Sequence, residues 1–250
     1  GGVPADPESA MGSFIPASSQ EARSHGYLFA VADGRGCLDR DKTALAEAIS
    51  RVVVGFAGAR PGAMLISLLP ELIEHANAVM HQHVLDVESF GEKPAAALVT
   101  CALRYNQAVV SHVGDSSCYL VRDGAALPLT RDHPAPAVKG AGSVMSRDPW
   151  SRMTPAMLRQ ALGPEPYVVP DTVAATLYPG DVLVLCTRGV DRALCESRIA
   201  EIVAQRKSAC AIAHELVAHA AGACSRRNAT AQVIRVRSVE ERDQHRRAAG

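Results

Sequence analysis

Hydrophobic and polar positions follow two different periods along this chain, which predicts both strands and helices. An apolar run at 27–32 (YLFAVA) stops at Asp33-Gly34 and predicts a buried strand that ends in a tight turn. Apolar residues then recur at helical spacing over 43–57 and again over about 63–87, which predicts a long helical hairpin. Pro70 lies in the first half of the second helix, where it marks a kink or the start of the regular part.

From residue 95 the pattern changes to short strand-like runs. They occupy 95–105, 107–114, 116–124, 171–178, 181–187 and 229–237. Short polar turns join the first three runs, so we expect an antiparallel meander there. Two amphipathic helices are predicted near 197–205 and 208–223. Residues 131–156 are rich in proline and predict an irregular excursion, such as a flap over a site. The predicted elements follow the order strand, two helices, strands, two helices, strand, and this order favours sheet layers with helical pairs outside them.

Length and composition are those of one large globular domain. The chain has 250 residues, of which 48% are hydrophobic and only 4% aromatic, so the core must consist mainly of alanine, valine, leucine and isoleucine. We expect a flexible segment at 1–12, one domain over 13–237 and a charged tail at 238–250. The 26 basic and 26 acidic residues balance, so there is no electrostatic reason to expect nucleic acid or an anionic membrane as partner. No apolar run is long enough to span a bilayer.

The seven cysteines predict free thiols rather than disulfides. Their number is odd, none forms a CxxC pair, and several lie inside apolar runs, where cysteine behaves as a small buried hydrophobe. Free thiols are typical of a reducing compartment, and the first twelve residues do not have the pattern of a signal peptide. We therefore expect an intracellular protein, most simply a cytoplasmic one.

Charged side chains stand at the ends of the predicted strands. Asp33-Gly34, Gly114-Asp115 and Thr187-Arg188-Gly189 each follow a strand, and Arg227-Asn228 precedes the last one. Loops at a sheet edge are where sites are commonly assembled. The alternative is that each Asp-Gly or Gly-Asp pair is an ordinary turn, and any one of them alone would favour that interpretation.

Six stretches in chain order resemble motifs of the metal-dependent protein phosphatase 2C (PPM) family. They are LFAVADGRG, SHVGDSSCYLVRDG, LTRDHP, LRQALG, LYPGDVLVLCTRGV and SRRNATAQVIRV, and they extend from about Ser13 to Arg237. The resemblance implies an α+β fold, an α-β-β-α sandwich of two antiparallel sheets flanked by helical pairs. It also implies a site between the sheets where carboxylates hold two Mg²⁺ or Mn²⁺ ions, and where a metal-activated water attacks a phosphoserine or phosphothreonine.

The family's metal ligands carry over only in part. The Asp-Gly pair is present as Asp33 and Gly34, and the aspartate of the VGDS motif is Asp115. The family's N-E-D-A string is best matched by Ser19 to Ala22, which would make Glu21 the first acidic ligand. Two positions where the family has aspartate hold arginine here.

Those two positions are Arg188, in the motif usually read SDG, and Arg227, in the motif usually read DN. The family's phosphate-holding arginine, which precedes N-E-D-A, is also missing. Two such exchanges change the formal charge of the site by about four units. A guanidinium stays protonated and offers a cation no lone pair, so we expect no metal cofactor and a catalytically inactive pseudophosphatase.

Three hypotheses follow for this site. Arg188 and Arg227 occupy the space of the metals and pair with Asp33, Asp115 and Glu21. Alternatively, the two arginines, with Arg226 and Arg35, bind a phosphate group without cleaving it. In the third, one metal at Asp33 and Asp115 keeps a weak serine/threonine phosphatase activity.

For the inactive protein we expect a scaffold or regulatory role. Its partner would be a protein, such as a kinase or a phosphoprotein. The helical hairpin and the excursion at 131–156 are the expected partner surfaces.

Overall fold

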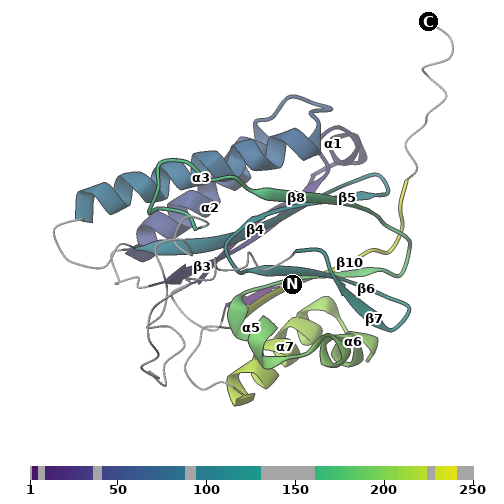
Figure 1. Ribbon diagram of the computed structural model, residues 1–250. Helices are drawn as coiled ribbons and strands as arrows, with labels where there is room; N and C mark the ends of the chain where they lie inside the picture. The colour runs from purple at the N-terminus through teal and green to yellow at the C-terminus, as the bar shows by residue number, and fades with distance from the viewer. Residues whose placement is uncertain are drawn as a thin grey trace, which may run out of the picture.

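Two five-stranded antiparallel sheets pack face to face, and helices cover the outer face of each (Figure 1). This computed structural model describes residues 2–4, 9–35, 41–87, 94–130, 161–205, 207–223 and 229–240. The layers run helices, sheet, sheet, helices, which confirms the predicted α+β sandwich. In the described part of the chain, no helix combines the length and apolar character that a membrane span requires.

The first sheet has the strand order β2-β3-β4-β5-β8. Its strands are β2 (Ser9–Phe14), β3 (Tyr27–Arg35), β4 (Ala95–Arg104), β5 (Gln107–Val113) and β8 (Asp171–Thr176). Helices α2 (Asp41–Ala57) and α3 (Leu65–Val87) cover its outer face. The short helix α1 (Ser19–Ser24) lies between β2 and β3 in the chain. Pro70 lies near the start of α3, which is continuous through it.

The second sheet has the strand order β1-β10-β9-β6-β7. Its strands are β1 (Gly2–Pro4), β6 (Ser117–Arg122), β7 (Ala125–Pro128), β9 (Val182–Cys186) and β10 (Thr230–Arg235). Three helices pack on its outer face: α5 (Arg188–Ala193), α6 (Glu196–Ala204) and α7 (Ala209–Ala223).

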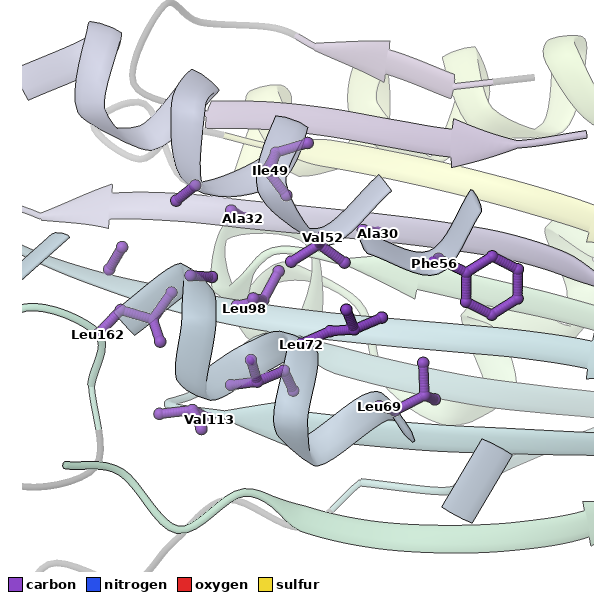
Figure 2. Close-up of a cluster of buried hydrophobic side chains, with 14 of the residues drawn as sticks. Ala30, Ala32, Ile49, Val52, Phe56, Leu69, Leu72, Leu98, Val113 and Leu162 are labelled. Atoms are coloured by element: carbon purple, nitrogen blue, oxygen red, sulfur yellow. The ribbon is translucent and has the colours of Figure 1, made fainter. Parts of the chain in front are cut away.

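The core has three layers because the central strands are buried on both faces. In β4, Leu98 faces α2 and α3, where it joins Val52 and Phe56 in the cluster that Figure 2 shows. The next residue, Val99, belongs to the cluster between the two sheets. A strand covered on both sides reads as one continuous apolar run, which is what the sequence of β4 shows. The third cluster lies between the second sheet and α5, α6 and α7.

Strand pairing corrects one expectation from the sequence. The first three strand-like runs do not form one meander: β4 and β5 pair with each other, but β6 pairs with β7 and β9 in the other sheet. The two strands around Pro179-Gly180 are likewise in different sheets. Gly114-Asp115 is therefore a crossing between the sheets, with Gly114 at a positive φ of 89°.

The N-terminal residues correct a second expectation. Residues 2–4 and 9–12, expected to be flexible, belong to β1 and β2, and each sheet has one of these strands at its edge. The predicted excursion at 131–156 lies outside the described residues, as do residues 241–250 of the predicted tail.

A bidentate ion pair holds the second crossing between the sheets, at residues 177–181. Arg122 Nε and Nη2 donate to the two carboxylate oxygens of Asp181 at 2.8 and 2.7 Å, and the Tyr178 N–H donates to the same carboxylate. Burial alone raises the pKa of Asp181, but the bonds from Arg122 and Tyr178 outweigh it and hold that pKa below its ordinary value. Since Asp181 is only 2% exposed, the charged carboxylate depends on these donors.

We expect Asp181→Asn to lower the free energy of unfolding by about 1–3 kcal/mol at pH 7, because it breaks a charge-assisted network. The folded-state pKa is lowered, so this contribution is complete above the unfolded pKa of about 3.9 and is lost as pH falls through the folded value. Urea unfolding of both proteins between pH 7 and pH 2.5 measures the difference. Asp123→Asn, at an exposed turn, is the matched control. A gap between wild type and Asp181→Asn that stays constant down to pH 2.5 would contradict this account.

Candidate functional site

One edge of the sandwich joins the two sheets through a chain of hydroxyl groups. In β2, Ser9 lies opposite Asp33 of β3, and its Oγ is 2.6 Å from Thr230 Oγ1 in the other sheet. The Thr230 N–H donates to Thr187 Oγ1, and the Thr187 N–H donates to the Thr230 carbonyl, both at 3.0 Å. The ends of β3 and β9 and the start of β10 therefore meet at this edge, as their motifs predicted.

Arg188 and Asp115 form an ion pair at this edge. Arg188 Nη1 donates to Asp115 Oδ2 at 2.5 Å, and the two side chains are only 15% and 12% exposed. Arg188 is the first residue of α5, and Asp115 lies in the crossing from β5 to β6. The pairing expected from the first hypothesis is thus present for these two residues.

Asp191 anchors the same helix to β6, and the sequence reasoning missed it. Its carboxylate accepts hydrogen bonds from Ser117 Oγ at 3.1 Å and from the Tyr119 hydroxyl. Burial and the bond to Asp191 raise the pKa of Tyr119, so the phenol stays protonated and donates. Arg188 and Asp191 are three residues apart and share one face of α5.

A signal for this anchor was present in the sequence. Asp115, Ser117 and Tyr119 alternate from the residues just before β6 into its start, and the spacing of Arg188 and Asp191 matches one helical turn. The sequence Thr187-Arg188-Gly189 predicts a turn after a strand, whereas in the structure α5 begins at Arg188.

Asp33 and Gly34 lie where the motif comparison predicted. Both are buried near the end of β3, opposite Ala97 and Ala96 of β4. Asp33 alternates with Val31, which belongs to the cluster between the sheets, so the carboxylate faces the gap between the two sheets.

Glu21 is not brought to this edge. It lies in α1, which follows the end of β2 where Phe14 pairs with Leu28, whereas Asp33 pairs with Ser9 at the other end of that strand. Its carboxylate accepts from the Ala17 N–H at 2.6 Å, and its own N–H donates to Ser18 Oγ. Glu21 thus caps α1 and is no candidate metal ligand.

The remaining candidates fall outside the described residues. Arg226 and Arg227 lie in the stretch 224–228. The backbone of Arg35 ends β3 opposite Ala95, but its side chain is not described. The pairing and anion-binding expectations for these side chains stay predictions.

Among the residues that the structure describes, the donor set at this edge does not fit a pair of divalent ions. Mg²⁺ and Mn²⁺ are bound by oxygen ligands, mainly carboxylates, and one carboxylate oxygen of Asp115 is already bonded to a guanidinium. A unit charge at ~4 Å from a like charge is repelled by about 4 kcal/mol at an effective dielectric of 20, and a divalent ion doubles that. Within the described ranges, no three histidine, cysteine, aspartate or glutamate side chains gather closely enough to hold a metal.

Sequence comparison finds relatives among bacterial phosphatases. The chain is 29% identical over 112 residues to the serine/threonine phosphatase stp of Listeria innocua. This match covers 44% of this chain and 44% of that protein, so it spans less than half the length of the relative. No family model matches the chain.

Solved structures extend the similarity to nearly the whole chain. The serine/threonine phosphatase of S. agalactiae superposes with a TM-score of 0.71 at 21% identity, covering 92% of this chain and 94% of that one. The PPM Ser-Thr phosphatase MsPP of Mycobacterium smegmatis, solved in complex with cacodylate, superposes with a TM-score of 0.66 at 27% identity. That alignment covers 91% of this chain and 97% of MsPP.

Proposed function

We propose that this chain, which is similar to protein phosphatases 2C in fold and in part of its sequence, is a catalytically inactive member of that family that acts by binding a protein partner. In this role it is a scaffold or regulatory domain, and its partner is a kinase or a phosphoprotein. The Arg188–Asp115 ion pair is the observation that carries the proposal.

The positive charge of Arg188 in this ion pair favours binding over hydrolysis. Metal-dependent hydrolysis of a phosphoester needs anionic oxygens to collect the cations. Here the guanidinium is held against a carboxylate in a largely buried setting, where it cannot lose its proton and where Asp115 would have to leave it to bind a metal. Arg227 puts another permanent positive charge at a position where the resembled family has an aspartate ligand.

The alternative is a weak metal-dependent serine/threonine phosphatase. Asp33, the Gly34 carbonyl and Asp115 are the oxygen groups that would hold a single ion, and the named relatives are phosphatases. The hypothesis that the arginines bind a phosphate group without cleaving it has less support from the described residues, since the Arg188 guanidinium already donates to Asp115.

We expect no hydrolysis of an aryl phosphate or of a phosphothreonine peptide by the wild-type chain in millimolar Mn²⁺. The rate should equal that of Asp33→Ala and should not change when EDTA is added. A release assay for inorganic phosphate on both proteins, with and without EDTA, measures this. An EDTA-sensitive rate that Asp33→Ala removes would overturn the proposal and support the weak phosphatase.

A further inference from the structure

The end of the hairpin formed by α2 and α3 exposes apolar side chains. We call residues 54–68 the hairpin tip. Val54 and Met64 are 65% and 69% exposed, and Arg60 is the only charged residue in the sequence from 52 to 70. Exposed apolar side chains that gather in one place mark interaction surfaces, whereas scattered ones are ordinary. The position of Val54 relative to Met64 therefore decides whether the tip is such a surface.

Val54 faces away from the first sheet. It lies two residues from both Val52 and Phe56, which are buried in the cluster that Figure 2 shows between α2 and the sheet. Two residues correspond to about half a helical turn, so Val54 is on the opposite side of α2. Gly58, four residues after Val54, is exposed and has no side chain to fill the space beside it.

Met64 lies on the side of α3 that faces α2. Met64, Leu68 and Leu72 are four residues apart, a spacing that puts side chains on one side of a helix. Leu72 is packed against α2, because a Cβ built on Gly55 would lie only 2.6 Å from Leu72 Cδ2. Val54 is the neighbour of Gly55 in the chain. Val54 and Met64 therefore flank the outer groove between the two helices, one from each helix.

The backbone of the hairpin tip is held in place by the rest of the domain. The Gly62 N–H donates to the Ser24 carbonyl at 2.8 Å, which ties the tip to α1. Arg104, the last residue of β4, donates from Nη2 to the Ala63 carbonyl at 2.7 Å. A surface that is already ordered loses little conformational entropy when a partner binds to it.

The tip is within the stretch 41–87, which the structure describes without a gap. Arg35 and Pro94 border the two nearest gaps in the chain, and both are at the far end of the first sheet from Arg104, since Arg35 pairs with Ala95 at the start of β4. The sequence of 241–250 (ERDQHRRAAG) has no large apolar residue that could cover Val54 and Met64.

The shape and the charge of the tip favour one kind of occupant. The groove between two packed helices accepts the ridge of a third helix. Arg60 gives this groove a positive charge at its end, so acidic residues on the incoming helix would complement it. A second copy of this chain would bring Arg60 against another Arg60, with no carboxylate in the tip to pair with either. A lipid surface is bound by helices with a strongly basic face, which a single arginine does not supply.

We propose that the hairpin tip, residues 54–68, binds an amphipathic helix of a partner protein whose apolar stripe is flanked by acidic residues. The apolar stripe lies between Val54 and Met64, and the acidic residues lie near Arg60. This inference rests on the proposed function, because it locates the surface by which the chain binds its protein partner.

The test is a titration of the whole chain with synthetic helical peptides, followed by fluorescence anisotropy. Each peptide is about 18 residues long, since shorter helices are marginal in water. The first has leucine at positions i, i+3, i+4 and i+7 with glutamate on both flanks. The second has lysine in place of glutamate, and the third has the first composition in an order without helical periodicity. We expect saturable binding of the first peptide only.

Variants at exposed positions separate the apolar contact from the charge. Val54→Gln and Arg60→Glu should each weaken the first peptide about tenfold or more, the size typical of a central contact. Arg60→Glu should in addition prefer the lysine peptide. Val169→Gln, at a side chain that is 84% exposed before β8, and Arg237→Glu, exposed beyond β10, are the matched controls and should leave binding unchanged. Thermal unfolding should be the same for all four variants as for wild type.

Several outcomes would overturn the proposal. They are equal binding of the glutamate and lysine peptides, equal binding by wild type and Val54→Gln, and no saturable binding at a peptide concentration of about 1 mM. Dimer formation that Val54→Gln disrupts would assign the tip to a second copy. Adsorption to vesicles of phosphatidylcholine and phosphatidylserine that Val54→Gln removes would assign it to a lipid surface, and either result also overturns the proposal.

The phosphate-release assay tests the proposed function separately. A chain that binds the first peptide through the tip but hydrolyses phosphoesters in an EDTA-sensitive way would contradict the inactive protein and leave the binding surface intact. A chain that shows neither hydrolysis nor peptide binding would contradict the binding surface alone.

Discussion

Replacing Arg188 by methionine should lower the free energy of unfolding by about 3 kcal/mol, the size typical of breaking a buried ion pair by removing one partner. Methionine fills similar space but leaves the carboxylate of Asp115 in a setting where it is only 12% exposed and has lost its guanidinium. Desolvation of that carboxylate, and not the loss of packing, dominates the expected effect. Urea unfolding at pH 7 measures it.

Two comparisons show whether the effect belongs to the pair. Arg51→Met removes the exposed i,i+4 contact to Glu47 and should change the free energy of unfolding by no more than ~0.5 kcal/mol. The double variant Arg188→Met with Asp115→Asn should be more stable than the sum of the two single changes predicts, because neither side chain is then a buried charge. If Arg188→Met is no more harmful than Arg51→Met, the ion pair does not stabilise this edge.

The second large effect is expected from returning both arginines to carboxylates. Arg188→Asp with Arg227→Asp should create Mn²⁺ binding, because it removes two permanent cations and restores carboxylates at the two positions where the resembled family has aspartate ligands. At a free Mn²⁺ concentration of about 100 times Kd, binding to the folded state alone would stabilise the variant by about 2.7 kcal/mol. Wild type should show no such stabilisation.

Thermal unfolding in a Mn²⁺ series, with calorimetry on the same samples, measures this gain. Arg23→Asp with Arg51→Asp makes the same change in net charge at exposed positions far from the edge, and it should show no Mn²⁺ dependence. Saturable stabilisation of the wild-type chain by Mn²⁺, equal to that of the double variant, would mean that Arg188 and Arg227 do not exclude the metal. Full turnover need not return, since the phosphate-holding arginine of the family is also absent from the sequence.

Much of the secondary structure could be predicted because burial imposes a period on the sequence. The apolar faces of α2 and α3 recur at helical spacing, and β4 and β9 are buried on both sides and read as apolar runs. Partner choice could not be predicted in the same way. Gly114-Asp115 has the residues of a hairpin turn, and a turn signal specifies a local backbone conformation, not the sheet that the next strand joins.

Glu21 shows how a motif match fails when a local signal competes with it. Ser18 and Glu21 have the spacing of a helix capping box, and in the structure Ser18 Oγ accepts from the Glu21 N–H while the Glu21 carboxylate accepts from the Ala17 N–H. The match to a metal ligand depended only on the likeness of Ser19 to Ala22 to the family's N-E-D-A string. In space, α1 follows the end of β2 at Phe14, whereas Asp33 lies beside Ser9 at the other end of this six-residue strand.

The positive charge at positions 188 and 227 follows from the sequence alone, because a guanidinium is cationic at any working pH whatever surrounds it. Which acid Arg188 contacts depends on the fold. Asp115 is its partner because α5 begins at Arg188, and Asp191, one turn later, is bonded to Ser117 and Tyr119 of β6. Periodicity and motif spacing describe one element at a time. The contact between Arg188 and Asp115 instead depends on how α5 packs against β6, which lies about 70 residues earlier in the chain.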